Sequence, residues 1–109
     1  MTFHPEGEAL TKRLLELADL SPCRILDMGA GEGDSVRLLR SLGFDAVGID
    51  KAAKDDIIVG DFLNCPFPDG SFDAVLSECA FYVSGEAEGA LKEAFRLLKK
   101  GGRLLLSDV

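Results

Sequence analysis

Short apolar runs alternate along the chain with stretches in which apolar residues recur every three or four positions. The second pattern is typical of helices with one buried face, and it predicts helices over residues 8–19, 33–41 and 86–100. The apolar runs predict strands over residues 24–28, 45–50, 57–59, 72–77 and 103–107, with a short helical turn over 51–54. Nearly all-apolar strands that alternate with helices indicate one parallel sheet covered by helices on both faces.

Prolines and glycines mark where these elements stop. Pro22 ends the first helix, because the residue before a proline avoids the helical region. Gly43 and the glycine pair at 101–102 are placed to end the second and third helices. Residues 62–71 hold two prolines and an Asp-Gly pair, which predict an irregular loop.

Length and charge narrow the class of protein. The 109 residues suffice for one domain, covering residues 1–109. A net charge of −7 argues against a nucleic-acid partner, because proteins that bind the phosphate backbone carry basic faces. No apolar run approaches about 18 residues and the start has no signal-peptide pattern, so we expect a cytoplasmic protein without membrane contact.

The three cysteines predict neither a disulfide framework nor a structural metal site. Cys23, Cys65 and Cys79 are odd in number, lie far apart and include no Cys-x-x-Cys pair. We expect buried free thiols and no bound metal.

A glycine-rich loop follows the first predicted strand. Residues 25–33 read ILDMGAGEG, with glycines at alternate positions and a predicted helix directly after them. Such a loop at the carboxyl end of a strand is where a nucleotide-like ligand lies in open α/β sheets. The dinucleotide pattern Gly-x-Gly-x-x-Gly is not met, because its sixth position is Asp34, and no Gly-Lys-Ser/Thr follows. An NAD-dependent enzyme is therefore disfavoured.

Acidic residues surround this loop in the expected sheet. Asp27, Glu32 and Asp34 flank the loop. Asp50 ends the second predicted strand, Asp61 follows the third and Glu78 follows the fourth. A pyrophosphate at this edge would be repelled, whereas a ligand with ribose hydroxyls and a cationic centre would be attracted. Asp50 lies about 20 residues past the loop, where an acid accepts hydrogen bonds from ribose.

In these features the chain resembles the class I S-adenosylmethionine-dependent methyltransferases. The similar segments occur in the family's order at residues 25–33, 47–50, 60–62, 66–76 and 91–106. They are closest in style to the branch that includes the ubiquinone and menaquinone methyltransferases. The resemblance implies a Rossmann-like three-layer sandwich with sheet order 3-2-1-4-5 and a small-molecule methyl acceptor.

The resemblance also implies a set of residues that bind S-adenosylmethionine and its product S-adenosylhomocysteine. Gly29 to Gly31 would line the methionine part beside Asp27, Asp50 would hold the ribose, and Asp61 would accept from the adenine N6. The full implied set is Asp27, Gly29, Ala30, Gly31, Asp50, Lys51, Asp61, Phe62 and Ser77.

Methyl transfer requires a general base only when the acceptor must lose a proton. His4, Glu78 and Tyr82 are the candidates. Two alternatives stay open, a non-catalytic module that binds the cofactor or its product, and a fragment of a longer methyltransferase.

The C-terminal end departs from the family pattern. Family members continue past the fifth strand with a helix and an antiparallel strand pair, whereas this chain stops at Val109. The fifth strand would then leave an apolar sheet edge, which natural proteins cover. We expect either a homodimer that covers this edge or a fragment of a longer protein.

Overall fold

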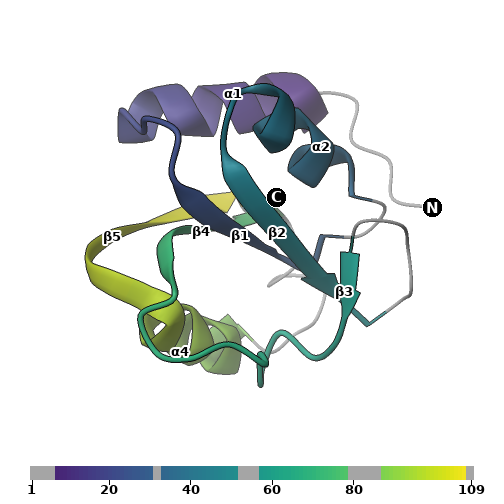
Figure 1. Ribbon diagram of the computed structural model, residues 1–109, viewed down its shortest axis with the longest axis vertical. Coiled ribbons are helices and arrows are strands. Elements are labelled where there is room, and N and C mark those ends of the chain that lie inside the picture. The colour runs from purple at the N-terminus through teal and green to yellow at the C-terminus, as the bar shows by residue number, and fades with distance from the viewer. Residues whose placement is uncertain (1–6, 31–32, 52–56, 79–86, 108–109) are drawn as a thin grey trace.

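A computed structural model describes residues 7–30, 33–51, 57–78 and 87–107. Figure 1 shows a central sheet with helices above and below it. The elements are α1 (Gly7–Ala18), β1 (Arg24–Met28), α2 (Asp34–Ser41), β2 (Asp45–Asp50), β3 (Ile57–Val59), β4 (Phe72–Glu78), α4 (Ala87–Leu97) and β5 (Leu98–Ser107). Each predicted strand and helix is therefore present, and the turn predicted over 51–54 lies almost wholly outside the described residues.

The five described strands form one sheet in the order β3-β2-β1-β4-β5, and every pair is parallel. This confirms the predicted order 3-2-1-4-5. The strand order reverses at β1, which pairs with β2 on one side and β4 on the other. In an open parallel sheet, ligands bind outside the carboxyl ends of the strands at such a switch point.

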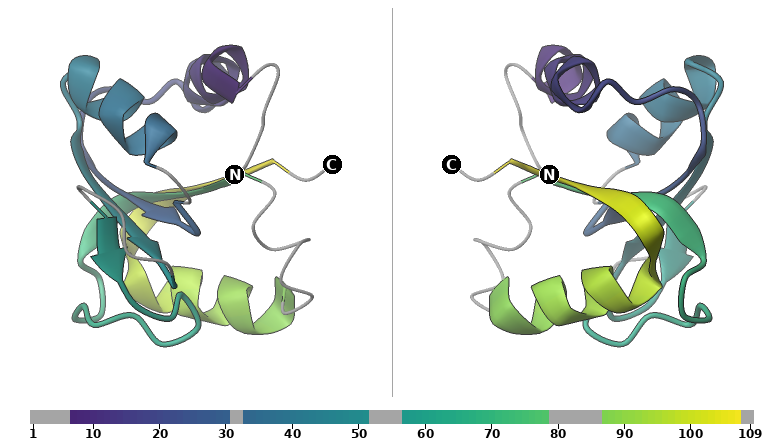
Figure 2. Two further views of the ribbon diagram at one scale, coloured as in Figure 1. Left: turned by 90° about the vertical axis from the view of Figure 1, so that its right-hand side faces the viewer. Right: turned by 90° about the vertical axis from the view of Figure 1, so that its left-hand side faces the viewer.

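The two faces of the sheet carry separate apolar clusters. One cluster lies under α1 and α2 and includes Ile25, Val36 and Leu39. The other lies under α4 and includes Leu26, Phe72 and Leu97. Figure 2 shows α1 and α2 on one side of the sheet and α4 on the other, which confirms the three-layer prediction.

The end of α2 follows the predicted pattern. Gly43 has a φ of 94°, its amide donates to the Arg40 carbonyl at 3.1 Å, and the Phe44 amide donates to the Leu39 carbonyl at 3.0 Å. These two bonds form a Schellman motif, which closes the helix and turns the chain into β2.

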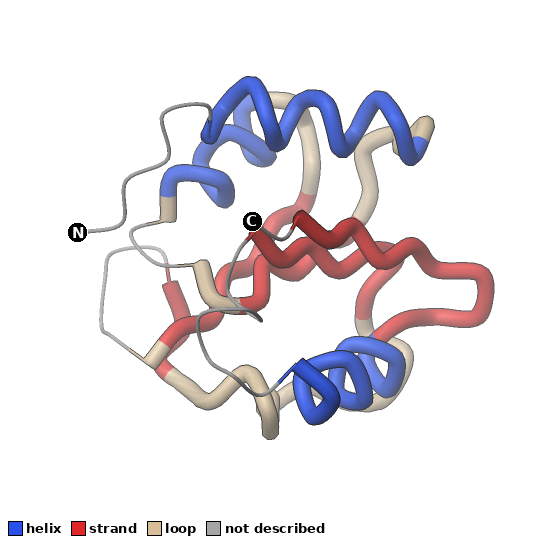
Figure 3. Tube along the Cα trace, turned by 180° about the vertical axis from the view of Figure 1, so that it is seen from behind, coloured by secondary structure: helices blue, strands red, loops and turns tan. Residues whose placement is uncertain are grey.

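The predicted boundary between α4 and β5 is wrong. The helix predicted over 86–100 ends at Leu97, and β5 begins at Leu98 rather than at Arg103. Leu98 pairs with Phe72 and Arg103 pairs with Ala74, so the residues between them bulge out of the ladder. Gly101 has a φ of 81°, a conformation that favours glycine. Figure 3 shows β5 continuing directly from α4.

Candidate functional site

The glycine-rich loop is hydrogen-bonded to the end of β2. The amides of Gly29 and Ala30 both donate to the carbonyl of Ile49, at 2.9 and 3.0 Å. Gly29 and Gly33 have φ values of 79° and 85°. Both amides are thus used by the fold, and a ligand would meet this part of the loop through close approach rather than through these two donors. Gly31 lies outside the described residues.

Gly48 provides the space in which this loop lies against the sheet. A Cβ atom at this position would lie 2.6 Å from Ile57 Cδ1, 2.7 Å from Val36 Cγ2 and 2.8 Å from the Cβ of Ala30. Real side chains do not tolerate such contacts, so the approach requires glycine. No role was predicted for Gly48 from the sequence, although a glycine inside an otherwise apolar strand is a signal of close approach.

Three of the predicted acidic residues lie at or just after the carboxyl ends of neighbouring strands. Asp27 in β1 is 3% exposed and pairs in register with Gly48 of β2. Asp50 is half-buried at the end of β2, and its carbonyl accepts the Gly60 amide at 2.9 Å. That bond joins the end of β2 to the segment leading into Asp61, which is exposed. The ends of these strands therefore meet at one edge of the sheet, beside the glycine-rich loop.

Asp61 and Phe62 begin the irregular loop that the prolines predict. One carboxylate oxygen of Asp61 accepts the Leu63 amide at 2.9 Å, and its carbonyl accepts the Asn64 amide at 3.0 Å. The Phe62 side chain is buried in the cluster under α4. Any contact of Phe62 with a ligand at this edge would therefore use its backbone more than its ring.

The Ser77 hydroxyl is a buried polar atom without a hydrogen-bond partner among the described residues. Ser77 is 0% exposed near the end of β4 and pairs in register with Leu106 of β5. A buried hydroxyl normally has a partner, and a position where the described residues supply none suits contact with a water or a ligand. Its place beside the switch point fits a site that accepts a polar ligand.

The remaining predicted residues are only partly described. Lys51 is exposed directly after Asp50. Glu78 is the last residue of β4, and its side chain is outside the description. His4 and Tyr82 lie outside the described residues altogether.

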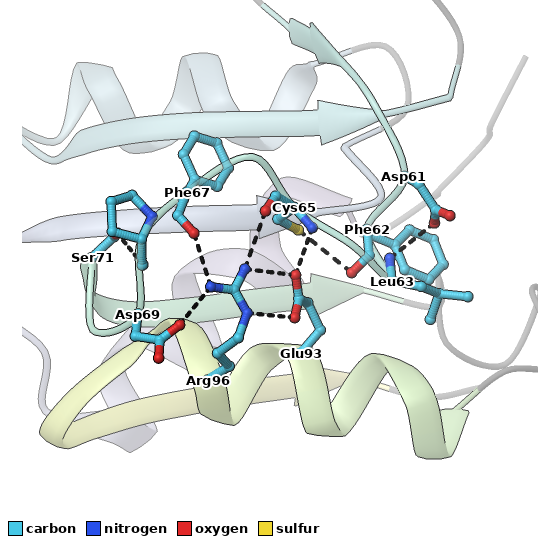
Figure 4. A network of polar contacts seen from close by, with 10 residues as sticks. Asp61, Phe62, Leu63, Cys65, Phe67, Asp69, Ser71, Glu93 and Arg96 are labelled. Atoms are coloured by element: carbon cyan, nitrogen blue, oxygen red, sulfur yellow. Dashed lines mark hydrogen bonds and ion pairs between the residues drawn. The ribbon is translucent and has the colours of Figure 1, made fainter.

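An ion pair on α4 fastens the loop that begins at Asp61 (Figure 4). Glu93 accepts from Nε and Nη2 of Arg96 at 2.7 and 2.8 Å, and from the Cys65 amide at 2.5 Å. Arg96 donates further to the carbonyls of Cys65 and Phe67 at 3.1 and 2.9 Å, and to Asp69 at 2.8 Å. The hydrogen bonds from Arg96 hold the pKa of Glu93 below its usual value, so this carboxylate stays ionised at neutral pH.

Sequence reasoning missed Glu93 and Arg96, although one signal was present. Helical spacing places Glu93 on the same face as Ala90, Ala94 and Leu97, all buried. A carboxylate on a buried helix face needs a charged partner, and Arg96 follows three positions later.

The two described cysteines are free thiols, and of these Cys65 is buried as predicted. Cys23 is half-buried and Cys65 is buried. Burial raises the pKa of Cys65 to about 12, so its thiol stays protonated. Within the described ranges, no three His, Cys, Asp or Glu residues are placed to hold a metal ion, and no helix is long and apolar enough to cross a membrane.

A shallow open groove lies at the opposite end of the strands, where β1 and β4 begin. It is lined by residues before β1 and by the bulge of β5, among them Pro22, Cys23, Asp73, Lys99 and Arg103. These positions are at the amino ends of β1 and β4, away from the glycine-rich loop. The groove therefore contributes nothing to the candidate site.

Comparison with known proteins gives matches over most of the chain. A family model described as "Methyltransferase domain" matches residues 26–106. The malonyl-[acyl-carrier protein] O-methyltransferase 1 of Coxiella burnetii is 37% identical over 113 residues, covering 94% of this chain and 40% of that protein. The demethylmenaquinone methyltransferase of Thermotoga maritima is 33% identical over 112 residues, covering 90% of this chain and 49% of that protein.

A solved structure extends the match to three dimensions. The SAM-dependent methyltransferase of Thermotoga maritima, described as a possible histamine N-methyltransferase, superposes with a TM-score of 0.70 at 29% identity. The alignment covers 91% of this chain and 50% of that structure. The chain thus spans half or less of the length of these three proteins.

Proposed function

Since the chain belongs to the methyltransferase domain family, we propose that it binds S-adenosylmethionine and serves methyl transfer to a small-molecule acceptor. One observation carries the proposal: the glycine-rich loop and the ends of β2 and β3 are hydrogen-bonded together at the switch point of the sheet. The bonds are those from Gly29 and Ala30 to Ile49 and from Gly60 to Asp50. They bring carboxylates beside a loop that a ligand can approach closely, which suits a cationic ligand with ribose hydroxyls.

In this proposal each part of the cofactor has its own group of residues. Gly29, Ala30 and Gly31 line the methionine part near Asp27, while Asp50 accepts from the ribose hydroxyls. Asp61 accepts from the adenine N6, and the Phe62 amide and Lys51 border the same half of the cofactor. The Ser77 hydroxyl, which has no hydrogen-bond partner within the described ranges, supports a polar neighbour near the reacting end.

When bound, S-adenosylmethionine supplies a methyl group already activated on its sulfonium, so the chain's own task is alignment and exclusion of water. A general base is needed only for an acceptor that must lose a proton. Glu78 is a candidate because it ends β4 beside the switch point. His4 and Tyr82 are kept as the other candidates from the sequence.

The setting of the protein is also part of the proposal. We infer a cytoplasmic location and no nucleic-acid partner from the net charge of −7 and the apolar pattern of the sequence. β5 lies at the sheet edge, and Leu106 is 42% exposed, which supports coverage of this edge by a second copy. Light scattering across a dilution series would detect the dimer, and a monomer throughout would refute it.

Calorimetry with S-adenosylmethionine, S-adenosylhomocysteine and NAD tests the binding function. We expect the two adenosyl ligands to bind and NAD to fail, because its pyrophosphate would face the carboxylates. Asp50→Ala should weaken adenosyl binding by about 1–3 kcal/mol, or roughly 5- to 150-fold. Asp45→Ala is the matched control, since Asp45 begins the same strand and forms an ion pair with Arg24 at 2.9 Å. Failure of both adenosyl ligands to bind the wild-type chain would refute the proposal.

A further inference from the structure

We propose that Glu93 and Arg96 are positioning residues for adenine recognition: they hold the loop from Asp61 to Ser71 so that Asp61 and Phe62 face the adenine base. This inference rests on the proposed cofactor site. It assigns α4, which contributes no residue to that site, the task of setting the conformation of its adenine end.

The loop's own hydrogen bonds lie within residues 61–65 and between the Ser71 hydroxyl and the Pro68 carbonyl. The loop forms no strand or helix, and Pro66 and Pro68 have no amide hydrogen to donate. Around the prolines the loop is held from outside, because the carbonyls of Cys65 and Phe67 accept hydrogen bonds from the Arg96 side chain. The backbone carbonyl of Arg96 also accepts a hydrogen bond from the Gly70 amide, at 2.9 Å.

Glu93 provides the acceptor that the loop needs at its midpoint. Its side chain is 9% exposed, and it accepts the Cys65 amide and two donors of Arg96. A carboxylate this buried is stable only when paired, so the two charges and the loop form one unit. A lysine at position 96 would keep the charge but lose the planar fork that reaches two carbonyls and a carboxylate at once.

Hydrogen bonds continue from Cys65 to the residues assigned to adenine. The Cys65 thiol donates to the Phe62 carbonyl at 3.4 Å. The amides of Leu63 and Asn64 donate back to the side chain and the carbonyl of Asp61. The segment 61–65 is therefore a single turn whose far end is bonded to α4.

Loss of this anchor should affect one part of the ligand selectively. If the turn moves, the Asp61 carboxylate and the Phe62 amide move with it, whereas Asp50 and the glycine-rich loop keep their bonds to the sheet. A purely structural role for the ion pair would lower stability without changing which base the site prefers. The preference between adenine and hypoxanthine, which carries an oxygen in place of the N6 amine, separates these two cases.

The test measures binding of S-adenosylhomocysteine and S-inosylhomocysteine by calorimetry, well below the unfolding temperature of each variant. The wild-type chain should prefer the adenosyl ligand by about 10- to 100-fold. With the inosyl ligand, the Asp61 carboxylate would face the carbonyl oxygen of hypoxanthine instead of an amine that donates to it. Glu93→Gln and Arg96→Lys should reduce this preference to about 3-fold or less, mainly through weaker adenosyl binding. Lys92→Gln is the matched control, because Lys92 forms an exposed ion pair with Glu88 on the same helix, at 4.0 Å.

Hydrogen exchange in the ligand-free protein provides a second measurement. The amides of Leu63, Cys65 and Gly70 should exchange at least about 10-fold faster in Glu93→Gln and keep their rates in Lys92→Gln. Unchanged rates, or an unchanged base preference in both Glu93→Gln and Arg96→Lys, would overturn the inference alone. A wild-type chain that binds neither ligand would instead refute the proposed function, and the positioning role with it.

Discussion

Replacing Ser77 by alanine should make the free protein more stable and its ligand complex weaker. The side chain of Ser77 is fully buried, and its hydroxyl has no hydrogen-bond partner among the described residues. In the unfolded chain that hydroxyl is hydrated, so folding takes a polar group out of water, and no described residue compensates for the lost hydration. Ser77→Ala removes this cost, whereas a ligand that bonds to the hydroxyl loses a partner.

The size of the effect follows from two opposing contributions. A buried group without a partner costs about 1–3 kcal/mol. Deleting one oxygen atom leaves a void of roughly 15 Å³, which costs about 0.4 kcal/mol at about 24 cal/mol per Å³. The free energy of unfolding should therefore rise by about 0.6–2.6 kcal/mol, and the unfolding temperature by about 3–11 °C for a domain of this size.

Urea unfolding followed by circular dichroism, without ligand, measures the first effect. Val75→Ala is the matched control, because Val75 is fully buried two positions earlier on the same face of β4. It loses two methyl groups and should lose about 1–3 kcal/mol. Binding of S-adenosylhomocysteine to Ser77→Ala should weaken by about 2- to 12-fold. A loss of stability similar to that of Val75→Ala would refute the reasoning, since it would mean that the hydroxyl is bonded in the free protein.

Three further outcomes are expected. Hydrogen bonds from Arg96 are the largest cause of the lowered folded-state pKa of Glu93. The ionised Glu93 side chain therefore stabilises the fold fully above the unfolded pKa of about 4.3, and this stabilisation is lost as the pH falls through the folded pKa. Urea midpoints of the wild-type chain should fall more steeply below about pH 5 than those of Glu93→Gln. Iodoacetamide at pH 8 should label Cys65, whose pKa burial raises to about 12, at least about 100-fold more slowly in the folded than in the urea-unfolded chain, as peptide mass spectrometry would show. Gly48→Ala should lower the free energy of unfolding by about 1–3 kcal/mol, and an unchanged urea midpoint would contradict the close contacts at that position.

The sequence predicted the sheet because its local and global signals agree. The apolar runs at 24–28 and 72–77 are too short for helices and are apolar on both faces, so central positions in a parallel sheet suit both. Gly43 likewise sits where the periodic pattern of α2 stops. At these positions local propensity, the burial pattern and the course of the chain all indicate the same secondary structure.

The end of α4 could not be predicted in the same way. Leu98 continues the helical spacing of Leu91 and Ala94, and it is equally suited to a strand. Pairing with Phe72 decides the outcome, and that residue lies 26 positions earlier. Tertiary contacts therefore overrode a local pattern that was ambiguous by itself.

Some residues of the candidate site could be predicted from local patterns, whereas others depend on tertiary contacts. Asp27 and Asp50 follow from strand ends, and the order of the sheet brings such ends to one edge. The role of Glu93 depends on a contact with Cys65, 28 positions away, through a loop without periodicity. No spacing rule connects those two residues, so only the folded chain reveals the pair.

This difference in construction has a consequence for how the two halves of the proposed site can change. The half proposed for methionine and ribose is fixed by backbone bonds, from Gly29 and Ala30 to Ile49 and from Gly60 to Asp50, which no side-chain substitution removes directly. The adenine end is fixed mainly by side chains of α4 that bind backbone atoms of the loop. Substitutions on α4 can therefore alter base recognition while the glycine-rich loop and the strand ends keep their geometry. Changes of base preference in this fold should accordingly arise on α4 and its loop before they arise at the glycine-rich loop.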